Sequence, residues 1–378
     1  MRNQRTLEQS RQALTRRQAL RAGAGAVVAL SSFAFPRASL GQDKMTKELV
    51  ISTWSGFFSD AVRQSLVEPF QKEFGVQVRV GVTGNAAELM TRIRAGAMGG
   101  GGDVIDLFWN EYPTAYTAIR QGWVEPLRVE NIPNYASVLP SLNKAQRPVP
   151  WDPAPGVNAA PAQMVSRGIA YDPRRINRKL DSLAELWNPD LGRRIAIFNN
   201  TSWMVGNGAF RTGQDPNAIA DIERVWNALR EQRKVVGRYF NNLVEGQELF
   251  KNETAWIAPL NGGRVLDLRS QGIPLEYYKP KEGWMLNADV LQIGKGSPNR
   301  FTAEKFIDFY YRSDIVTRAS ELMNFPIASR NVQATDKIKS LPDFDPGGEL
   351  AGARFYDPTY WDTNTSAWTE KVREIIAS

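Results

Sequence analysis

The first third of the chain alternates between two hydrophobic periods. Residues 48–54 form a short apolar run that ends in a polar, aromatic turn. After this run, apolar residues from Val62 to Phe74 recur every three to four positions, as in a helix with one buried face, and Gly75 marks the end of that helix. The same alternation continues, and it predicts further strands at 76–82 and 104–109 with helices at 86–97 and 112–121. Strands separated by helices indicate a mostly parallel sheet with helices on both faces.

A stretch rich in Pro and Asn, residues 133–161, interrupts this alternation. It is either a lid over a ligand or a solvated crossover between two lobes. Beyond it, the pattern predicts strands at 166–171, 194–198 and 254–260 and helices at 183–187 and 219–232. The chain is long enough for two lobes of ordinary domain size.

Polar, aromatic or Gly-rich residues follow four of the predicted strands, at 54–57, 109–112, 199–203 and 261–263. In open parallel sheets, ligands bind beyond the carboxyl ends of the strands, where such turns converge. Each turn also suits a helix cap, so both roles are open for any one of them. Four such strand ends together favour a site for a small polar ligand, bound by stacking and hydrogen bonds.

The first 44 residues differ from the rest of the chain. Arg16 and Arg17 precede an apolar run at 22–35, and small residues follow near 38–41. Because a helix needs about 20 apolar residues to span a bilayer, this run predicts a removable export signal rather than an anchor. The paired arginines resemble the twin-arginine signal, which implies a folded chain exported by the twin-arginine machinery. The alternative is an ordinary secretory signal whose arginines supply only its basic start.

Charge and residue usage exclude several functions. The segment 1–44 holds eight of the 47 basic residues and two of the 40 acidic ones, so the remainder, with 39 and 38, is nearly neutral. The formal charge of +7 therefore gives no indication of nucleic-acid binding. The absence of Cys and His excludes thiol nucleophiles, imidazole bases, disulfides and nearly every zinc or copper site. We expect no cofactor and no bound metal.

Several ordered segments resemble one known family. They are 48–54 with Trp54, 75–78, 103–107, 122–126, 183–189, 249–263, 289–293, 303–310 and 324–331. Their order and spacing are similar to those of the periplasmic spermidine/putrescine-binding proteins, which are solute-binding proteins of ABC importers. The resemblance implies a two-lobe type II periplasmic binding protein fold of class α/β, each lobe a mostly parallel sheet flanked by helices, with hinge strands between. It assigns 47–162 plus 261–312 to lobe 1 and 163–260 plus 313–378 to lobe 2, closing over a ligand in the cleft.

The resemblance also bears on the ligand. Family members stack a polyamine on aromatic rings and pair its ammonium groups with carboxylates. Trp54 and Asp289 match such positions, and Phe57 or Phe58 lies where a second aromatic ring is expected, whereas the family's acidic second-lobe loop is 199–203 here, with Asn and Ser. The ligand is therefore left open between a di- or polyamine, another small polar organic solute and an inorganic or metal-complex ligand. The candidate ligand-binding residues are Trp54, Ser55, Phe57, Asn110, Glu111, Tyr112, Asn200, Ser202, Trp203, Asn261, Asp289 and Arg330.

Two features have competing interpretations. Tyr277 and Tyr278 resemble the paired tyrosines with which iron-binding relatives chelate Fe(III), but they are also explained by packing in an edge strand. Arg330 either faces a ligand carboxylate or is a surface arginine at the start of a helix.

These observations predict a periplasmic monomer that is not an enzyme and that delivers a small molecule to an inner-membrane ABC permease. The alternative is an exported hydrolase or lyase that uses paired carboxylates such as Glu111 and Asp289. Neither a G-x-S-x-G motif nor a histidine base is present to support that alternative.

Overall fold

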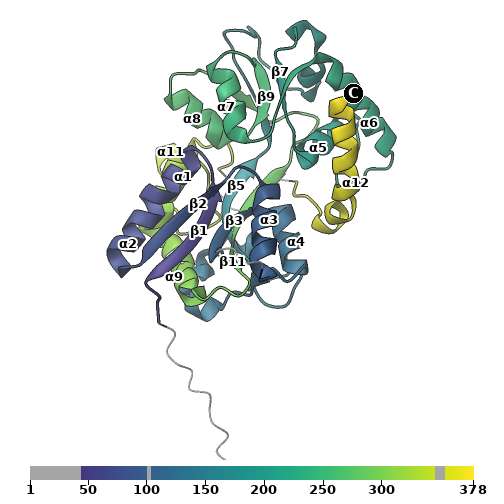
Figure 1. Cartoon of the computed structure of the whole chain (residues 1–378). Coiled ribbons are helices and arrows are strands. Elements are labelled where there is room, and N and C mark those ends of the chain that lie inside the picture. Colours follow the sequence, from purple (N-terminus) through teal and green to yellow (C-terminus); the bar gives the residue numbers. More distant parts are fainter. Residues whose placement is uncertain (1–43, 100–103, 345–353) are drawn as a thin grey trace, which may run out of the picture. The chain divides into compact units, whose positions relative to one another are not determined.

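The computed structural model describes residues 44–99, 104–344 and 354–378, and residues 44–378 form one compact unit (Figure 1). The predicted export signal with Arg16 and Arg17 lies outside the described residues, except for Lys44, as does Asp103 of the resemblance. Within the described part of the chain, no helix combines the length and the apolar character that a membrane span requires.

Lobe 1 is built on a sheet of order β2-β1-β3-β11-β4, with β5 also paired to β11. Its strands are β1 (Glu48–Trp54), β2 (Gln77–Thr83), β3 (Leu107–Glu111), β4 (Val124–Glu125), β5 (Ala160–Ser166) and β11 (Leu286–Gly294). Its helices are α1 (Phe57–Val62), which continues through a π-helical turn (Arg63–Val67) into α2 (Glu68–Phe74), then α3 (Ala86–Ala97), α4 (Tyr112–Arg120), α9 (Arg300–Tyr310) and α10 (Ser313–Met323). β1 runs parallel to β2 and β3, whereas β11 runs antiparallel to β3, β4 and β5.

Lobe 2 is built on a second sheet, of order β10-β6-β9-β7-β8. Its strands are β6 (Gly168–Tyr171), β7 (Ile195–Phe198), β8 (Val236–Phe240), β9 (Ile257–Leu260) and β10 (Glu276–Tyr278), and its helices are α5 (Thr201–Arg211), α6 (Ile222–Val235), α7 (Leu243–Lys251), α8 (Gly262–Ser270) and α12 (Pro358–Ala377). β7 is parallel to β8 and β9, and β6 is antiparallel to β9 and β10. The predicted two-lobe α/β architecture is confirmed, but each sheet is mixed rather than mostly parallel. The reason is that the strands by which the chain passes between lobes add antiparallel pairs.

Local sequence signals explain several element boundaries. β1 and α3 have the predicted bounds, and α3 starts where the Asn85 side chain accepts a hydrogen bond from the backbone N–H of Glu88. Gly75 ends α2 in the left-handed conformation, at φ 65°. β3 starts later than the predicted residue 104, because Asp106 turns its carboxylate back to accept from the N–H of Val50 at 2.7 Å.

The Pro-rich stretch 133–161 is neither a lid nor a solvated crossover. It forms 3-10 turns at Pro133–Ser137 and Pro140–Leu142, and its last residues begin β5. Tyr135, Leu142 and Trp151 are buried in the core of lobe 1. The prediction failed because apolar residues in this stretch occur without a regular period.

The chain passes from lobe 1 to lobe 2 between β5 and β6, and it returns between β10 and β11 (Figure 1). At the first crossing, a Cβ atom on Gly168 would lie 2.4 Å from the ring of Tyr277 and 2.7 Å from the carbonyl oxygen of Tyr278. Only glycine fits there, so the two crossing segments lie in close contact.

The packing differs from the predicted lobe boundaries at two places. Val265, Leu268 and Leu275, expected in lobe 1, are buried with the lobe 2 strands. Conversely, α10, expected in lobe 2, is buried against the lobe 1 core through Val316 and Met323. The first boundary was misplaced because the return crossing occurs at 279–285 rather than near 261. The second was misplaced because the chain crosses to lobe 2 again only between α10 and α12.

Candidate functional site

A cavity of about 70 Å³ lies between the lobes, where strand ends from both sheets converge. Lobe 1 lines it with residues that include Trp54, Phe57, Glu111, Gln163, Asn287 and Asp289, and lobe 2 with Phe198, Asn200, Trp203, Leu243, Asn261 and Arg264. Arg167, the residue between β5 and β6, contributes from the crossing itself. The position agrees with the rule that open sheets bind ligands at the carboxyl ends of their strands.

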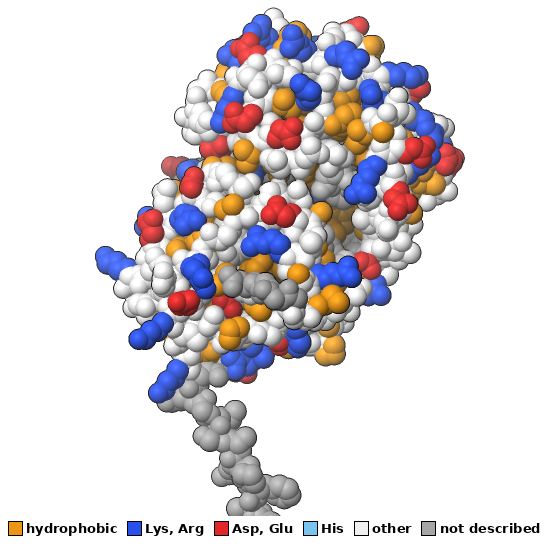
Figure 2. Space-filling view, viewed as in Figure 1, with side chains coloured by type: hydrophobic (Ala, Val, Ile, Leu, Met, Phe, Trp, Pro, Cys, Tyr) orange, Lys and Arg blue, Asp and Glu red, His pale blue; other side chains and the backbone are white. Residues whose placement is uncertain are grey.

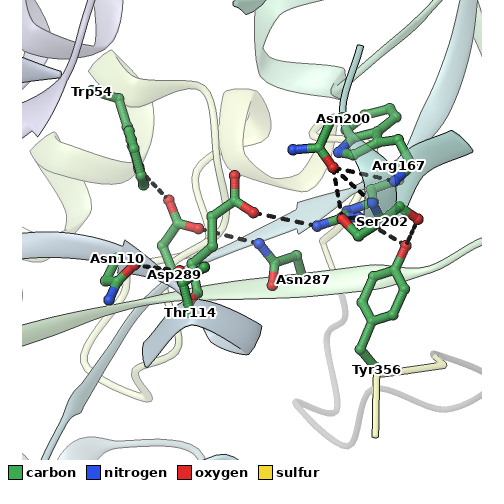
Figure 3. A network of polar contacts seen from close by, with 11 residues as sticks. Trp54, Asn110, Thr114, Arg167, Asn200, Ser202, Asn287, Asp289 and Tyr356 are labelled. Atoms are coloured by element: carbon green, nitrogen blue, oxygen red, sulfur yellow. Dashed lines mark hydrogen bonds and ion pairs between the residues drawn. The ribbon is translucent and has the colours of Figure 1, made fainter. Parts of the chain in front are cut away.

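The lobe 1 wall is centred on Asp289, in the middle of β11. Its side chain accepts a hydrogen bond from Trp54 Nε1 at 2.6 Å (Figure 3). It also accepts one from Gln163 Nε2 at 2.7 Å. Asp289 is 4 % exposed and lies directly opposite Glu111 of β3. Burial, followed by the charge of Glu111, raises the pKa of the Asp289 carboxyl well above its usual range. A cation in the cavity would stabilise the ionised form of the Asp289 carboxyl.

Two amide side chains complete that wall. The Nδ2 of Asn287 points to Asp289 Oδ1 at 3.4 Å, and the Nε2 of Gln163 bonds the other carboxylate oxygen. Their amide oxygens, Asn287 Oδ1 and Gln163 Oε1, are buried and accept no hydrogen bond among the described residues. Both side chains line the cavity, and their amide nitrogens hold the Asp289 carboxylate in place.

Arg167 stands between the two walls. Its guanidinium pairs with Glu111 Oε2 at 3.4 Å and donates to Ser202 Oγ at 2.7 Å and to the Tyr356 hydroxyl at 2.8 Å (Figure 3). It also lies over the rings of Trp203 and Tyr356, 5.2 and 4.5 Å from their centroids. Burial raises the pKa of Glu111, and Arg167 opposes this rise. Glu111 therefore already has a cationic partner within the protein.

The lobe 2 wall consists of helix N-termini and a buried cation. Asn200 caps α5 by accepting from the backbone N–H groups of Ser202 and Trp203, and Asn261 caps α8 by accepting from that of Arg264. Leu243, the first residue of α7, adds a third helix start. Arg264 is buried and donates to Gln247 Oε1 at 2.7 Å and across the cleft to the Ser55 carbonyl at 3.3 Å.

The structure brings seven of the twelve candidate residues to the cavity. These are Trp54, Phe57, Glu111, Asn200, Trp203, Asn261 and Asp289. Asn200 and Asn261 line the cavity and also cap helices, so the two roles proposed for strand-end residues coexist. Ser202 lies behind the wall, where it supports Arg167, and Ser55 meets Arg264 only through its carbonyl.

Three candidates lie away from the cavity. Asn110 is fully buried and pairs with Gln292 at 2.9 Å, because successive side chains of a strand point to opposite faces and Glu111 takes the cavity side. Tyr112 packs on Trp151, at a centroid distance of 4.4 Å, within the lobe 1 core. Arg330 is exposed, in agreement with a surface arginine.

Sequence reasoning missed five polar lining residues: Asn85, Gln163, Arg167, Arg264 and Asn287. Asn287 could have been predicted from the sequence, because it lies two residues before Asp289 on the same face of one strand. Gln163 could not, because it reaches Asp289 through an irregular pairing of β5 with β11 between Ala288 and Val290.

The tyrosine pair is explained by packing. Tyr277 contacts Gly168 and bonds the Ser166 hydroxyl, while the Tyr278 hydroxyl donates to the Ser182 carbonyl at 3.0 Å. Among the residues that the structure describes, no group of three or more Asp or Glu side chains is arranged to hold a metal ion.

The outer surface shows no concentration of one charge on the face in Figure 2, where basic and acidic side chains are interspersed.

Comparisons with known proteins agree with this geometry. Residues 65–346 match the family described as "Bacterial extracellular solute-binding protein". The "Spermidine/putrescine-binding periplasmic protein 1" of Haemophilus influenzae is 24% identical over 297 residues, which cover 77% of this chain and 76% of the relative.

Solved structures share the fold. The spermidine/putrescine ABC transporter substrate-binding protein PotD of Streptococcus pneumoniae has a TM-score of 0.69 and 17% identity, covering 88% of this chain and 100% of that one. AgtB of A. tumefaciens R10, in complex with agropinic acid, has a TM-score of 0.72 and 18% identity, covering 89% and 100%. The fold is that of the type II periplasmic binding proteins. The chain therefore belongs to the family of bacterial extracellular solute-binding proteins and is similar to its polyamine-binding members.

Proposed function

We propose that this protein is the extracytoplasmic substrate-binding component of an ABC importer and that it captures a small polar organic solute with an amine group. The charge of the lobe 1 wall is the observation that supports an amine group on the ligand. There Asp289 is buried without a cationic partner within ion-pair distance among the described residues.

An ammonium group fits this wall in charge and in hydrogen bonding. It has three donors and no acceptor, and the wall offers the Asp289 carboxylate. The rings of Trp54 and Phe57 line the same cavity and suit the methylene groups next to an ammonium. A buried carboxylate is costly unless it is paired, so a cationic ligand gains affinity by removing that cost.

The family leaves the ligand open. Its relatives include spermidine/putrescine-binding proteins and a protein in complex with agropinic acid. In this chain, none of the lobe 2 residues that line the cavity is acidic. The proposed ligand is therefore a small solute with an amine group rather than a long polyamine with ammonium groups in both lobes.

Capture occurs by closure of the lobes about the segments that cross between them. Arg264 of α8 already reaches the Ser55 carbonyl at the end of β1, so the walls touch in this structure. A ligand that contacts both walls stabilises the closed form over the open one, and the closed form is what the permease recognises.

We also propose that the protein is a periplasmic monomer, not an enzyme, and that it delivers its ligand to an inner-membrane ABC permease. The support is its family and the periplasmic relative. Export through the twin-arginine machinery remains our proposal for Arg16 and Arg17.

A thermal-shift screen of the purified protein tests this function. Amines, amino acids, sugars and organic acids are added, and the products are then analysed by mass spectrometry. We expect saturable stabilisation by amine-bearing solutes, by about 2.7 kcal/mol at 100 times Kd, with no chemical change in the ligand. Conversion of the ligand, or stabilisation only by solutes without an amine, would refute the proposal.

A further inference from the structure

The lobe 2 wall contains a buried cation that the amine does not explain. Arg264 is 6 % exposed and lines the cavity. Its hydrogen-bond partners are neutral, Gln247 Oε1 and the Ser55 carbonyl, and its guanidinium carbon lies 5.4 Å from the centroid of the Phe57 ring. No ion pair of Arg264 with an acid occurs among the described residues. Burial lowers its pKa to about 10.

The nearest acid reaches Arg264 only indirectly. Asp267 accepts a hydrogen bond from Gln247 Nε2 at 2.6 Å, and Gln247 then presents its oxygen to Arg264. This relay orients the guanidinium but leaves its charge without a carboxylate in contact. A buried arginine in this state attracts an anion.

Two uncompensated charges therefore face the cavity from opposite walls. Of the four charged lining residues, Glu111 and Arg167 pair with each other at 3.4 Å. The other two, Asp289 and Arg264, form no ion pair among the residues that the structure describes. The N-termini of α5, α7 and α8 strengthen the positive character of the Arg264 side, since helix N-termini favour anions.

We infer that the ligand is a zwitterion, whose ammonium binds Asp289 of lobe 1 and whose carboxylate binds Arg264 of lobe 2. This inference rests on the proposed function and names its substrate class. One such molecule neutralises both charges and bridges the lobes. A diamine would instead place its second ammonium beside a buried guanidinium and three helix N-termini, where like charges repel.

Ligands of equal chain length distinguish a zwitterion site from a diamine site. Isothermal titration calorimetry compares, at chain lengths of three to six carbons, the diamine, the ω-amino acid and the dicarboxylate, and the twenty standard amino acids are added as further zwitterions. For four carbons the three probes are putrescine, 4-aminobutanoate and succinate. We expect an amino acid to bind at least about tenfold more tightly than the diamine and the dicarboxylate of its length.

Variants on one helix test the role of Arg264. Arg264→Gln should lower the affinity for the best amino acid by about 30-fold or more. The affinity for the diamine should stay the same or rise. Arg264→Lys should restore part of the affinity, because it keeps the charge. Arg269→Gln on the exposed face of α8 is the control and should change neither affinity. Near-UV circular dichroism checks that each variant is folded.

Each outcome decides between the two proposals. A diamine that binds as tightly as the best amino acid, or an Arg264→Gln variant with full amino-acid affinity, overturns the zwitterion and leaves the amine receptor standing. If no zwitterion binds, the inference is wrong, and the screen of amines decides the proposed function separately.

Discussion

The two walls of the cavity differ in charge although both use strand ends that lead into helices. On lobe 2, the parallel strands β7 and β9 deliver Asn200 and Asn261, and the helix starts remain electropositive. On lobe 1, β11 runs antiparallel to β3 and places Asp289 opposite Glu111. The comparison shows that two mixed sheets present walls of different charge because acidic strand residues face the cavity in lobe 1 and capped helix starts with Arg264 face it in lobe 2.

The largest expected effect comes from the acidic wall. Asp289→Asn keeps the size of the side chain, and Gln163 can turn its amide to bond the new Nδ2. We expect the affinity for an amine-bearing ligand to fall about 100-fold or more, because a buried charge partner is lost. Calorimetry measures this loss. The matched control is Glu48→Gln, an exposed carboxylate on β1, and equal affinities of the two variants would contradict the role of Asp289.

A smaller effect is expected when the basic wall is made more acidic. Asn200→Asp preserves the cap of α5, since Asp caps helices as well as Asn does. It should shift the ratio of amino-acid to diamine affinity about tenfold in favour of the diamine. Asn188→Asp makes the same change in the cap of the 3-10 turn Pro189–Leu191, outside the cavity lining, and should leave the ratio unchanged. A shift of equal size in both variants would mean that the walls do not act separately.

The smallest effect is on stability. The pKa of Asp289 is raised in the folded protein, so the folded state binds more protons than the unfolded state between the two pKa values. Without ligand, stability should therefore fall as the pH rises above the usual carboxyl range.

Melting curves at several pH values measure this difference. Relative to Asp289→Asn, we expect the wild-type Tm to drop by about 2–4 °C for each kcal/mol lost as the pH rises, and a saturating amine ligand to reverse the drop. A wild-type Tm that follows the variant at every pH would show that Asp289 carries no uncompensated charge.

Local sequence signals placed part of the lining of the candidate site. The turns after β1, β3, β7 and β9 were predicted as the site, and each contributes at least one lining residue. Gln163 could not be predicted, because its position depends on how β5 pairs with a strand more than a hundred residues away. Arg264 lies in the first turn of α8, one residue beyond the predicted strand-end motif 261–263.

The position of Arg167 between β5 and β6 has a mechanical consequence. When two bodies rotate about an axis, the groups near that axis travel least. We therefore expect Arg167 to hold Glu111 and Ser202 in both the open and the closed protein. Arg264 and Ser55, from the far sides of the cleft, separate on opening. Opening would thus expose the Arg264 guanidinium and the Asp289 carboxylate to water. Only a ligand that carries both an anionic and a cationic group would then stabilise the closed form.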